Sequence, residues 1–210
     1  MTALQGKVAI VGGSSDGIGY AIARRLAGDG ADVALVARRA EPLEAAAARI
    51  RDETGRRAFT VAADIRKAHD CERIIAEPLA HFGRLDILVN NDGAPPLGEL
   101  MSFDDAAWDK AWQQNFMSVV RLTRGAVPAM RAAGGGRIAT GRLAKVFGPG
   151  GGGAVEQDET IAKLEKEIPL GRIGKPDEVA ALVALLVSES GGYMTGATLH
   201  VDGGRRASLL

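Results

Sequence analysis

The feature that most constrains this chain is the stretch at residues 7–19, Lys-Val-Ala-Ile-Val-Gly-Gly-Ser-Ser-Asp-Gly-Ile-Gly. Residues 8–11 form a short apolar run without a polar break, which predicts a parallel strand covered on both faces. After Gly17 the apolar positions recur at helical spacing, until Gly28 and Gly30 supply a stop. A strand, a tight turn and a helix in this order predict a phosphate-binding loop. Glycines let main-chain N–H groups approach a phosphate, and a helix N-terminus carries a partial positive charge.

The spacing of the glycines resembles the motif of a known family. Gly13, Gly17 and Gly19 follow the pattern G-x-x-x-G-x-G, which is similar to the T-G-x-x-x-G-x-G motif of the short-chain dehydrogenase/reductase family, with Gly12 in the threonine position. A glycine trio alone is an ordinary turn, and its place between a strand and a helix makes it specific. The resemblance implies that a dinucleotide contacts the loop at Gly13, Ser14, Ser15, Asp16, Gly17, Ile18 and Gly19.

Length and composition limit the classes of protein to which the chain can belong. Its 210 residues fit one domain, and we predict a single Rossmann-type dinucleotide-binding domain over residues 1–210, an α/β fold with a doubly wound parallel sheet in three layers. The 26 basic and 26 acidic residues balance and form no long block of one sign, so we expect no nucleic-acid partner. No apolar run approaches the roughly 20 residues that span a bilayer. We therefore expect no membrane partner and a cytoplasmic location. Cys71 is the single cysteine, which excludes a disulfide framework and a thiolate metal cluster.

The end of the second predicted strand, residues 32–37, bears on the choice of cofactor. Arg38 and Arg39 follow it. A carboxylate at this place would hold the ribose 2′-hydroxyl of NAD, whereas arginine accommodates the 2′-phosphate of NADP. We therefore favour NADP over NAD, and the alternative is that both arginines are solvated loop residues. Asp16 weakens this preference, because the resemblance implies that NADP-preferring relatives often carry a basic side chain in the glycine loop.

Two further strands, predicted at 58–62 and 85–89, end in polar motifs. Asp64 and Ile65 follow the first of them, and the resemblance implies that Asp64 contacts the adenine ring. The alternative role for Asp64 is as the N-cap of a helix at 67–82. Asn90-Asn91-Asp92-Gly93 follow the second strand and resemble the N-N-A-G motif of the family, with Asp92 replacing alanine. Asparagine amides can satisfy the turn while the main chain of Asn91, Asp92 and Gly93 approaches the ribose and the adenine.

A long helix is predicted over about 104–132, beginning near Ser102 and Asp104. Asn115 lies midway along it in Gln-Asn-Phe-Met-Ser-Val-Val, which resembles the N-x-x-S-V motif of the family. The resemblance implies that Asn115 belongs to a catalytic Asn-Ser-Tyr-Lys group, where the asparagine bends the helix and holds a water molecule of the proton relay. Pro128 is expected to kink the helix. Its expected interior positions are Trp108, Trp112, Phe116, Val119, Val120 and Val127.

The family pattern breaks after this helix. The resemblance implies a fifth strand ending in a catalytic serine, a helix carrying Tyr-x-x-x-Lys, and a sixth strand ending in Pro-Gly. The chain has two tyrosines, Tyr20 and Tyr193, and neither is followed by lysine four residues on. Of the catalytic group, only Asn115 is found.

Two alignments compete for the run Gly136 to Thr140. In the first it opens the fifth strand, which puts Leu143 at the serine position and Glu156 at the tyrosine position. In the second it is the P-G-x-x-x-T segment that follows the sixth strand, and Thr140 holds the nicotinamide amide or the diphosphate. We favour the second, because a glycine-rich stretch at 148–153, a helix at about 156–167 and Pro-Leu-Gly-Arg at 169–172 then follow in order. Two strands and one helix would be missing before Arg137, roughly 50 residues.

The end of the chain returns to the family pattern, with an apolar helix at 177–187 and a closing strand at 197–204. The resemblance implies that both contribute to a subunit interface, so we expect a homodimer or a homotetramer. It also implies an NADP(H)-dependent oxidoreductase, most like the 3-oxoacyl-acyl-carrier-protein reductases, with a small-molecule carbonyl or alcohol as substrate. The alternative is a catalytically inactive dinucleotide-binding or self-associating scaffold that lacks the Ser-Tyr-Lys machinery.

Overall fold

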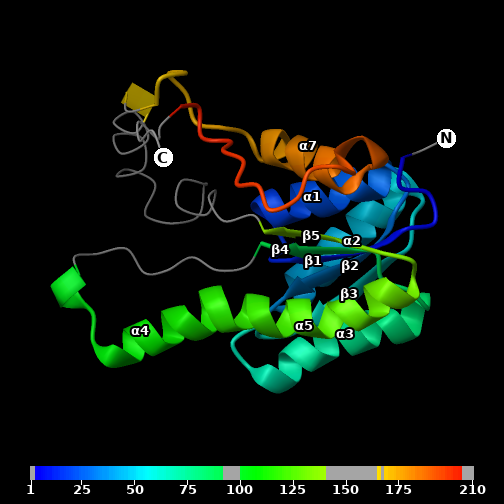
Figure 1. The fold of residues 1–210 in the computed structure, drawn as a ribbon, viewed down its shortest axis with the longest axis horizontal. Coiled ribbons are helices and arrows are strands. Elements are labelled where there is room, and N and C mark those ends of the chain that lie inside the picture. Colours follow the sequence, from blue (N-terminus) through cyan, green and yellow to red (C-terminus); the bar gives the residue numbers. More distant parts are fainter. Residues whose placement is uncertain (1–2, 92–99, 141–164, 167, 205–210) are drawn as a thin grey trace.

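The structure is a computed structural model that describes residues 3–91, 100–140, 165–166 and 168–204. Its centre is a parallel sheet of five strands in the order β3-β2-β1-β4-β5 (Figure 1). The strands are β1 (Val8–Gly12), β2 (Asp32–Ala37), β3 (Ala58–Ala62), β4 (Ile87–Asn90) and β5 (Arg137–Thr140). The α-helices are α1 (Gly17–Gly28), α2 (Ala40–Thr54), α3 (Ala68–Phe82), α4 (Asp105–Trp112), α5 (Ser118–Ala132) and α7 (Pro176–Val187). This arrangement confirms the predicted Rossmann-type α/β fold.

Alternation along the central strands builds the three layers. In β1, Ala9 and Val11 belong to the core beneath α1, α2 and α7, whereas Ile10 belongs to the core beneath α3 and α5. Both faces of the strand are therefore covered, as the unbroken apolar run predicted. Figure 1 shows α1 and α7 on one side of the sheet and α3 and α5 on the other.

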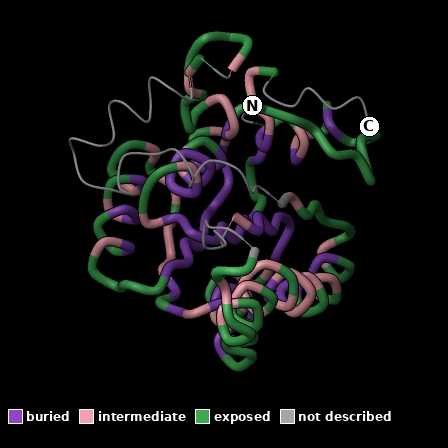
Figure 2. Tube along the Cα trace, turned by 90° about the vertical axis from the view of Figure 1, so that its left-hand side faces the viewer, coloured by how far each residue is buried: buried purple, intermediate pink, exposed green. Residues whose placement is uncertain are grey.

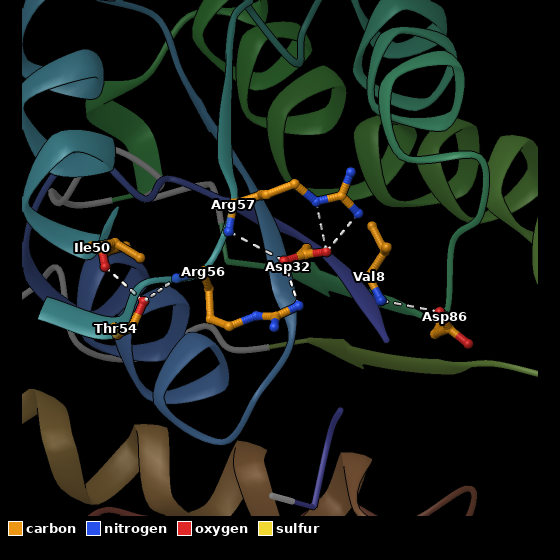
Figure 3. Close-up of polar contacts among 7 residues, drawn as sticks. All are labelled: Val8, Asp32, Ile50, Thr54, Arg56, Arg57 and Asp86. Carbon is orange, nitrogen blue, oxygen red and sulfur yellow. Dashed lines mark hydrogen bonds and ion pairs between the residues drawn. The ribbon is translucent and has the colours of Figure 1, made fainter. Parts of the chain in front are cut away.

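Two buried carboxylates fasten the amino ends of the strands (Figure 3). Asp32, the first residue of β2, accepts hydrogen bonds from the Arg56 and Arg57 side chains at 2.7 Å. Asp86, just before β4, accepts from the Val8 main-chain N–H at 3.0 Å. Burial would raise the pKa of each carboxyl group, but hydrogen bonds from the neighbouring cations outweigh it and both pKa values are lowered. These charges stabilise the amino edge of the sheet, opposite the edge at which the glycine loop follows β1.

The predicted long helix is present as three consecutive pieces. Asp104 is the N-cap of α4, accepting from the Ala107 N–H at 2.8 Å, and a π-helical turn, Gln113–Met117, joins α4 to α5. None of the six residues expected in its interior is fully buried, and Val119, Val120 and Val127 are partly exposed. Trp108, Trp112 and Phe116 are each about half exposed, because α4 extends beyond the edge of the sheet (Figure 1). The apolar spacing is present, but in the described residues the ring contacts of this face are local: Trp112 stacks on Phe116, and Trp108 meets Phe103 edge to face.

Residues 137–140 correct the favoured alignment. They form β5, which pairs in parallel with β4 from Ile87↔Arg137 to Asn90↔Thr140. The run is therefore the fifth strand and not the segment after a sixth. Placing Thr140 on a nicotinamide-binding segment after the sixth strand was wrong, because Gly136 to Ala139 have the short apolar pattern of a strand as well as that of the loop.

The closing strand predicted at 197–204 is also not formed. These residues lie in irregular structure, and Leu199 and Val201 are 44% and 38% exposed. Figure 2 shows this part of the tube, which runs towards the C-terminus, as largely exposed. A strand requires a partner for its backbone hydrogen bonds, and within the described ranges no strand lies beyond β5. Among the helices described, none has the length and apolarity needed to cross a membrane.

Candidate functional site

The strand order predicts a ligand crevice at the carboxyl ends of β1 and β4. From β1 the chain proceeds outward through β2 and β3, and it then returns to form β4 on the other side of β1. In open parallel sheets, ligands bind outside the carboxyl ends of the strands at such a reversal. Here the loop after Gly12 and the residues after Asn90 flank that point.

The glycine loop and the asparagine motif meet at this crevice although 79 residues separate them. Asn91 donates its side-chain N–H to the Gly12 carbonyl oxygen at 3.2 Å. Gly13 and Gly17 have φ angles of 61° and 60°, in the region that favours glycine. A Cβ at Gly19 would overlap the Gly13 carbonyl group and would lie 2.7 Å from the Asn91 amide nitrogen. The start of α1 is thus packed so closely on the loop and on Asn91 that Gly19 tolerates no side chain, as the third glycine of a dinucleotide-binding turn requires.

The polar side chains of the loop have distinct roles. Ser14 is fully buried, donates its hydroxyl to the Val11 carbonyl at 2.8 Å and accepts from the Val36 N–H at 2.9 Å. Its side chain therefore shapes the loop by fastening it to β2. Asp16 is exposed and caps α1, accepting from the Gly17 N–H at 2.7 Å. Ser15 and Ile18 are partly exposed at the same turn.

The ends of β2 and β3 bring the remaining predicted cofactor residues to the same edge. Arg38 and Arg39 follow β2 and are exposed, and Arg39 is the N-cap of α2. Asp64 receives the Arg66 side chain, whose Nε lies 2.9 Å from one carboxylate oxygen and 3.0 Å from the other. These hydrogen bonds lower the pKa of Asp64 to about 2, and the charge of Arg38 adds to the effect. Arg38 and Asp64 are thus electrostatic neighbours.

The alternative role of Asp64 as a helix cap is wrong. Helix α3 begins at Ala68, and its N-cap is Lys67, without a side-chain cap bond. Ile65 is buried in the core beneath α3 and α5, so its side chain forms part of the floor of this edge.

Asn115 lies in the π-helical turn between α4 and α5. Its side-chain N–H donates to the Ala111 carbonyl at 2.9 Å, and the Ser118 hydroxyl donates to the Gln114 carbonyl at 2.6 Å. Both side chains thus bond to main-chain carbonyls four residues earlier, within and just before the π-helical turn. Isolated π turns inside α-helices occur often at functional sites. The turn gives a physical origin for the irregularity that the family resemblance implied at Asn115.

No tyrosine accompanies Asn115 in the part of the chain that the structure describes. Tyr20 is buried in the core beneath α1 and α7, on the opposite face of the sheet from α5, and the Arg49 guanidinium lies 4.6 Å from its ring centre. Tyr193 is fully exposed after α7. Neither supplies a proton donor at the crevice.

Several predictions lie outside the described residues. These are the positions of Asp92, Gly93, Leu143 and Glu156, the glycine-rich stretch at 148–153, and the predicted helix at 156–167 apart from 165 and 166. Thr140 is described only as the last residue of β5. Within the described ranges, no group of three or more His, Cys, Asp or Glu side chains is placed to hold a metal ion.

Comparison with known proteins gives consistent results. A family profile described as "short chain dehydrogenase" matches residues 7–140, and one described as "Enoyl-(Acyl carrier protein) reductase" matches residues 149–206. "Dehydrogenase/reductase SDR family member 4" of Oryctolagus cuniculus is 32% identical over 250 residues, covering 98% of this chain and 96% of the relative. "3-oxoacyl-[acyl-carrier-protein] reductase" of Escherichia coli K12 is 32% identical over 241 residues, covering 95% and 97%. The structure of L-sorbose reductase from Gluconobacter frateurii, complexed with NADPH and L-sorbose, superposes with a TM-score of 0.89 at 28% identity, covering 99% of each chain.

These alignments locate the missing segment. The rabbit protein aligns over 250 residues with a chain of 210, so at least 40 of its residues have no counterpart here. The first family profile ends at Thr140 and the second begins at Pro149. The loss therefore falls after β5 and not before it. Pro149-Gly150 was the signal that sequence reasoning missed, since it fits the Pro-Gly that the resemblance places after the sixth strand.

Proposed function

The chain belongs to the short-chain dehydrogenase/reductase family, and from this premise we propose that it binds NADP(H) across the carboxyl edge of its sheet and serves the reduction of a ketone or a 3-oxoacyl thioester. The observation that carries the proposal is the close packing of the glycine loop against Asn91 at the reversal of strand order. The NADPH complex of the sorbose reductase and the activity named for the Escherichia coli relative support the cofactor and the reaction class.

In this proposal, each side of the crevice holds a different part of the dinucleotide. The main chain from Gly13 to Gly19 and the N-terminus of α1 face the pyrophosphate. Arg38 and Arg39 face the 2′-phosphate, and arginine suits this role because its guanidinium binds phosphate with two parallel hydrogen bonds. The adenosine lies against Asp64, Ile65 and the segment from Asn91 to Gly93.

The proton-transfer half of the reaction is where this chain departs from its family. NADPH supplies a hydride to a carbonyl carbon, and the carbonyl oxygen then requires a proton donor. The family uses a tyrosine whose pKa is lowered by a lysine, and the 210 residues contain no such pair. Asn115 can hold a water molecule, but an amide cannot replace an acid of suitable pKa.

This absence favours a second candidate function, a dinucleotide-binding protein without turnover. The two candidates share the cofactor site and differ in catalysis. Loss of general acid catalysis alone removes a factor of roughly 10² to 10⁴ in rate. We therefore expect micromolar NADPH binding from both candidates, and reduction of a 3-oxoacyl thioester from the first candidate alone.

One experiment separates these outcomes. NADPH binding is measured by titration calorimetry, and turnover by loss of NADPH absorbance with a 3-oxoacyl thioester, using the Escherichia coli enzyme as a positive control. Binding with turnover would establish the oxidoreductase, and binding without turnover the second candidate. No binding at millimolar NADPH would overturn both.

We propose in addition that the chain forms a homodimer or a homotetramer. The aromatic side chains of α4 and the π-helical turn (Trp108, Trp112 and Phe116) and the apolar side chains Leu185, Leu199 and Val201 are exposed in the single chain. Exposed apolar side chains that lie together on a surface are typical of interaction sites, and Trp112 and Phe116 stack on each other. Light scattering after size-exclusion chromatography is expected to give a multiple of 21.8 kDa. Trp112→Glu is expected to lower the measured mass towards that of the monomer. A monomer at all concentrations of the unmodified protein would contradict the proposal.

A further inference from the structure

A buried asparagine at the end of β4 has no hydrogen-bond partner in the described structure. Asn90 is 5% exposed, and neither its side-chain nitrogen nor its oxygen has a partner. Leaving an amide buried without partners is strongly unfavourable, and such groups in folded proteins almost always bind protein or ordered water. Asn90 therefore requires an occupant beside it.

A small cavity lies beside this side chain. Its volume is about 10 Å³, close to that of one water molecule measured in the same way. Most of its lining is apolar, contributed by β1, β4, α3 and α5, and its polar side chains are those of Asn90, Asn91 and Ser118. A buried water needs two or more polar partners, and this lining provides them.

Ser118 can be the second partner. It is 1% exposed, and its hydroxyl hydrogen is already donated to the Gln114 carbonyl at 2.6 Å. The lone pairs of its oxygen remain able to accept a hydrogen bond. A water in the cavity would donate to Ser118 Oγ while it donates to, or accepts from, the Asn90 amide.

We propose that Asn90 and Ser118 together hold one buried water molecule, and that this water fastens the π-helical turn to the end of β4. Ser118 directly follows the turn and holds its Gln114 carbonyl, so the water links the sheet to the segment that carries Asn115. Asn90 is thus a positioning residue for Asn115. The water site does not depend on the proposed function. The importance of the water for a reaction does rest on the proposed function.

The first test is a crystal structure of the full chain at a resolution that shows ordered water. A water molecule is expected about 2.7–3.2 Å from an amide atom of Asn90 and from Ser118 Oγ. A dry cavity, or an Asn90 amide bonded directly to a protein group, would overturn the proposal.

A double-mutant cycle supplies the second test. Asn90→Ala and Ser118→Ala each release the water, so the double variant should lose less thermal stability than the sum of the two losses. Asn90→Ser takes the place of Asn90→Ala if the latter does not fold. The matched control is Ser188→Ala, since Ser188, the C-cap of α7, also donates to a helix carbonyl, at 2.7 Å, but is partly exposed and does not line the cavity. The loss of thermal stability in Ser188→Ala should add in full to the loss in Asn90→Ala when the two substitutions are combined. If the losses of Asn90→Ala and Ser118→Ala were also fully additive, the two side chains would not share a water molecule.

The positioning role has its own readout, which needs no cofactor. In Asn90→Ala or Asn90→Ser, amide hydrogen exchange in residues 113–117 should accelerate by about tenfold while that of β2 stays unchanged. Equal acceleration in both regions, or none in 113–117, would leave Asn90 without a role in placing Asn115.

Discussion

At the scale of single residues, the crevice depends on a few atoms whose positions leave little freedom. The Gly19 Cα faces the Gly13 carbonyl and the Asn91 amide so closely that a methyl group has no space. Ser14 uses its hydroxyl twice, towards Val11 and Val36, to hold the loop on β2. The loop is therefore held in one shape before any ligand arrives, which would reduce the entropic cost of binding the proposed phosphate.

Gly19→Ala should lower NADPH affinity by at least about tenfold and reduce stability by about 1–3 kcal/mol, because the new methyl group must displace the Gly13 carbonyl or the Asn91 amide. Calorimetric titration and urea unfolding measure the two effects. Gly28→Ala is the matched control: it lies on the same helix, and its Cβ would meet nothing within 4 Å. If both variants bind NADPH equally, the loop does not form the phosphate cradle.

Arg38→Asp should move cofactor preference towards NADH. The new carboxylate repels a 2′-phosphate and can accept a hydrogen bond from the 2′-hydroxyl of NADH. The ratio of the two dissociation constants is expected to change by at least about tenfold, or 1.4 kcal/mol. Arg124→Asp, an equal charge change at an exposed position on α5, should leave the ratio unaltered. Unchanged discrimination in Arg38→Asp would remove the argument for NADP.

At the scale of elements, α1 connects the site to the core. It carries the glycine loop at its N-terminus, and its buried side chains pack both against the sheet and against α7. The run from α4 to α5 has the opposite character. Its second half is buried on α3 and the sheet, while its first half projects with exposed aromatic side chains. We therefore expect α1 to be stabilised by packing within the chain, and α4 to be stabilised by association with another copy of the chain.

Leu26→Ala tests the packing of α1. Leu26 is fully buried, so its truncation leaves a cavity in the core and should cost about 3 kcal/mol of unfolding free energy. Leu185→Ala on α7, where the side chain is 45% exposed, should cost less than about 0.5 kcal/mol in the monomer. Urea unfolding measures both. Equal losses would mean that α1 is not packed as the structure shows.

At the scale of the whole molecule, carboxylates at both edges of the sheet couple stability to pH. The folded-state pKa values of Asp32, Asp64 and Asp86 all lie below those of free aspartate, and that of Asp64 is lowered to about 2. The unfolded chain therefore binds protons at a higher pH than the folded chain does. The stability from these groups is fully present above the unfolded pKa of about 3.9 and is lost as pH falls towards 2.

The urea midpoint is accordingly expected to stay level between pH 7 and pH 5 and to fall steeply between about pH 4 and pH 2. Asp32→Asn should begin from a lower midpoint at pH 7, because it leaves Arg56 and Arg57 without their shared carboxylate. The urea midpoint of Asp32→Asn should then fall less than that of the unmodified protein between about pH 4 and pH 2. Parallel curves for the two proteins would show that Asp32 does not contribute to the acid sensitivity.

The sequence alone determined the local architecture. The apolar run at residues 8–11, the glycines at 13, 17 and 19, and the polar residues that end each strand identified the elements and most of the crevice, since periodicity and turn chemistry act between near neighbours. Where a segment fitted two local structures, only the tertiary structure decided which of them formed. It paired residues 137–140 with β4, left 197–204 without a strand partner and exposed Trp108 and Trp112 on α4. Strand pairing and burial depend on segments far apart in the chain, and a chain that lacks at least 40 residues of its relatives has lost some of those partners.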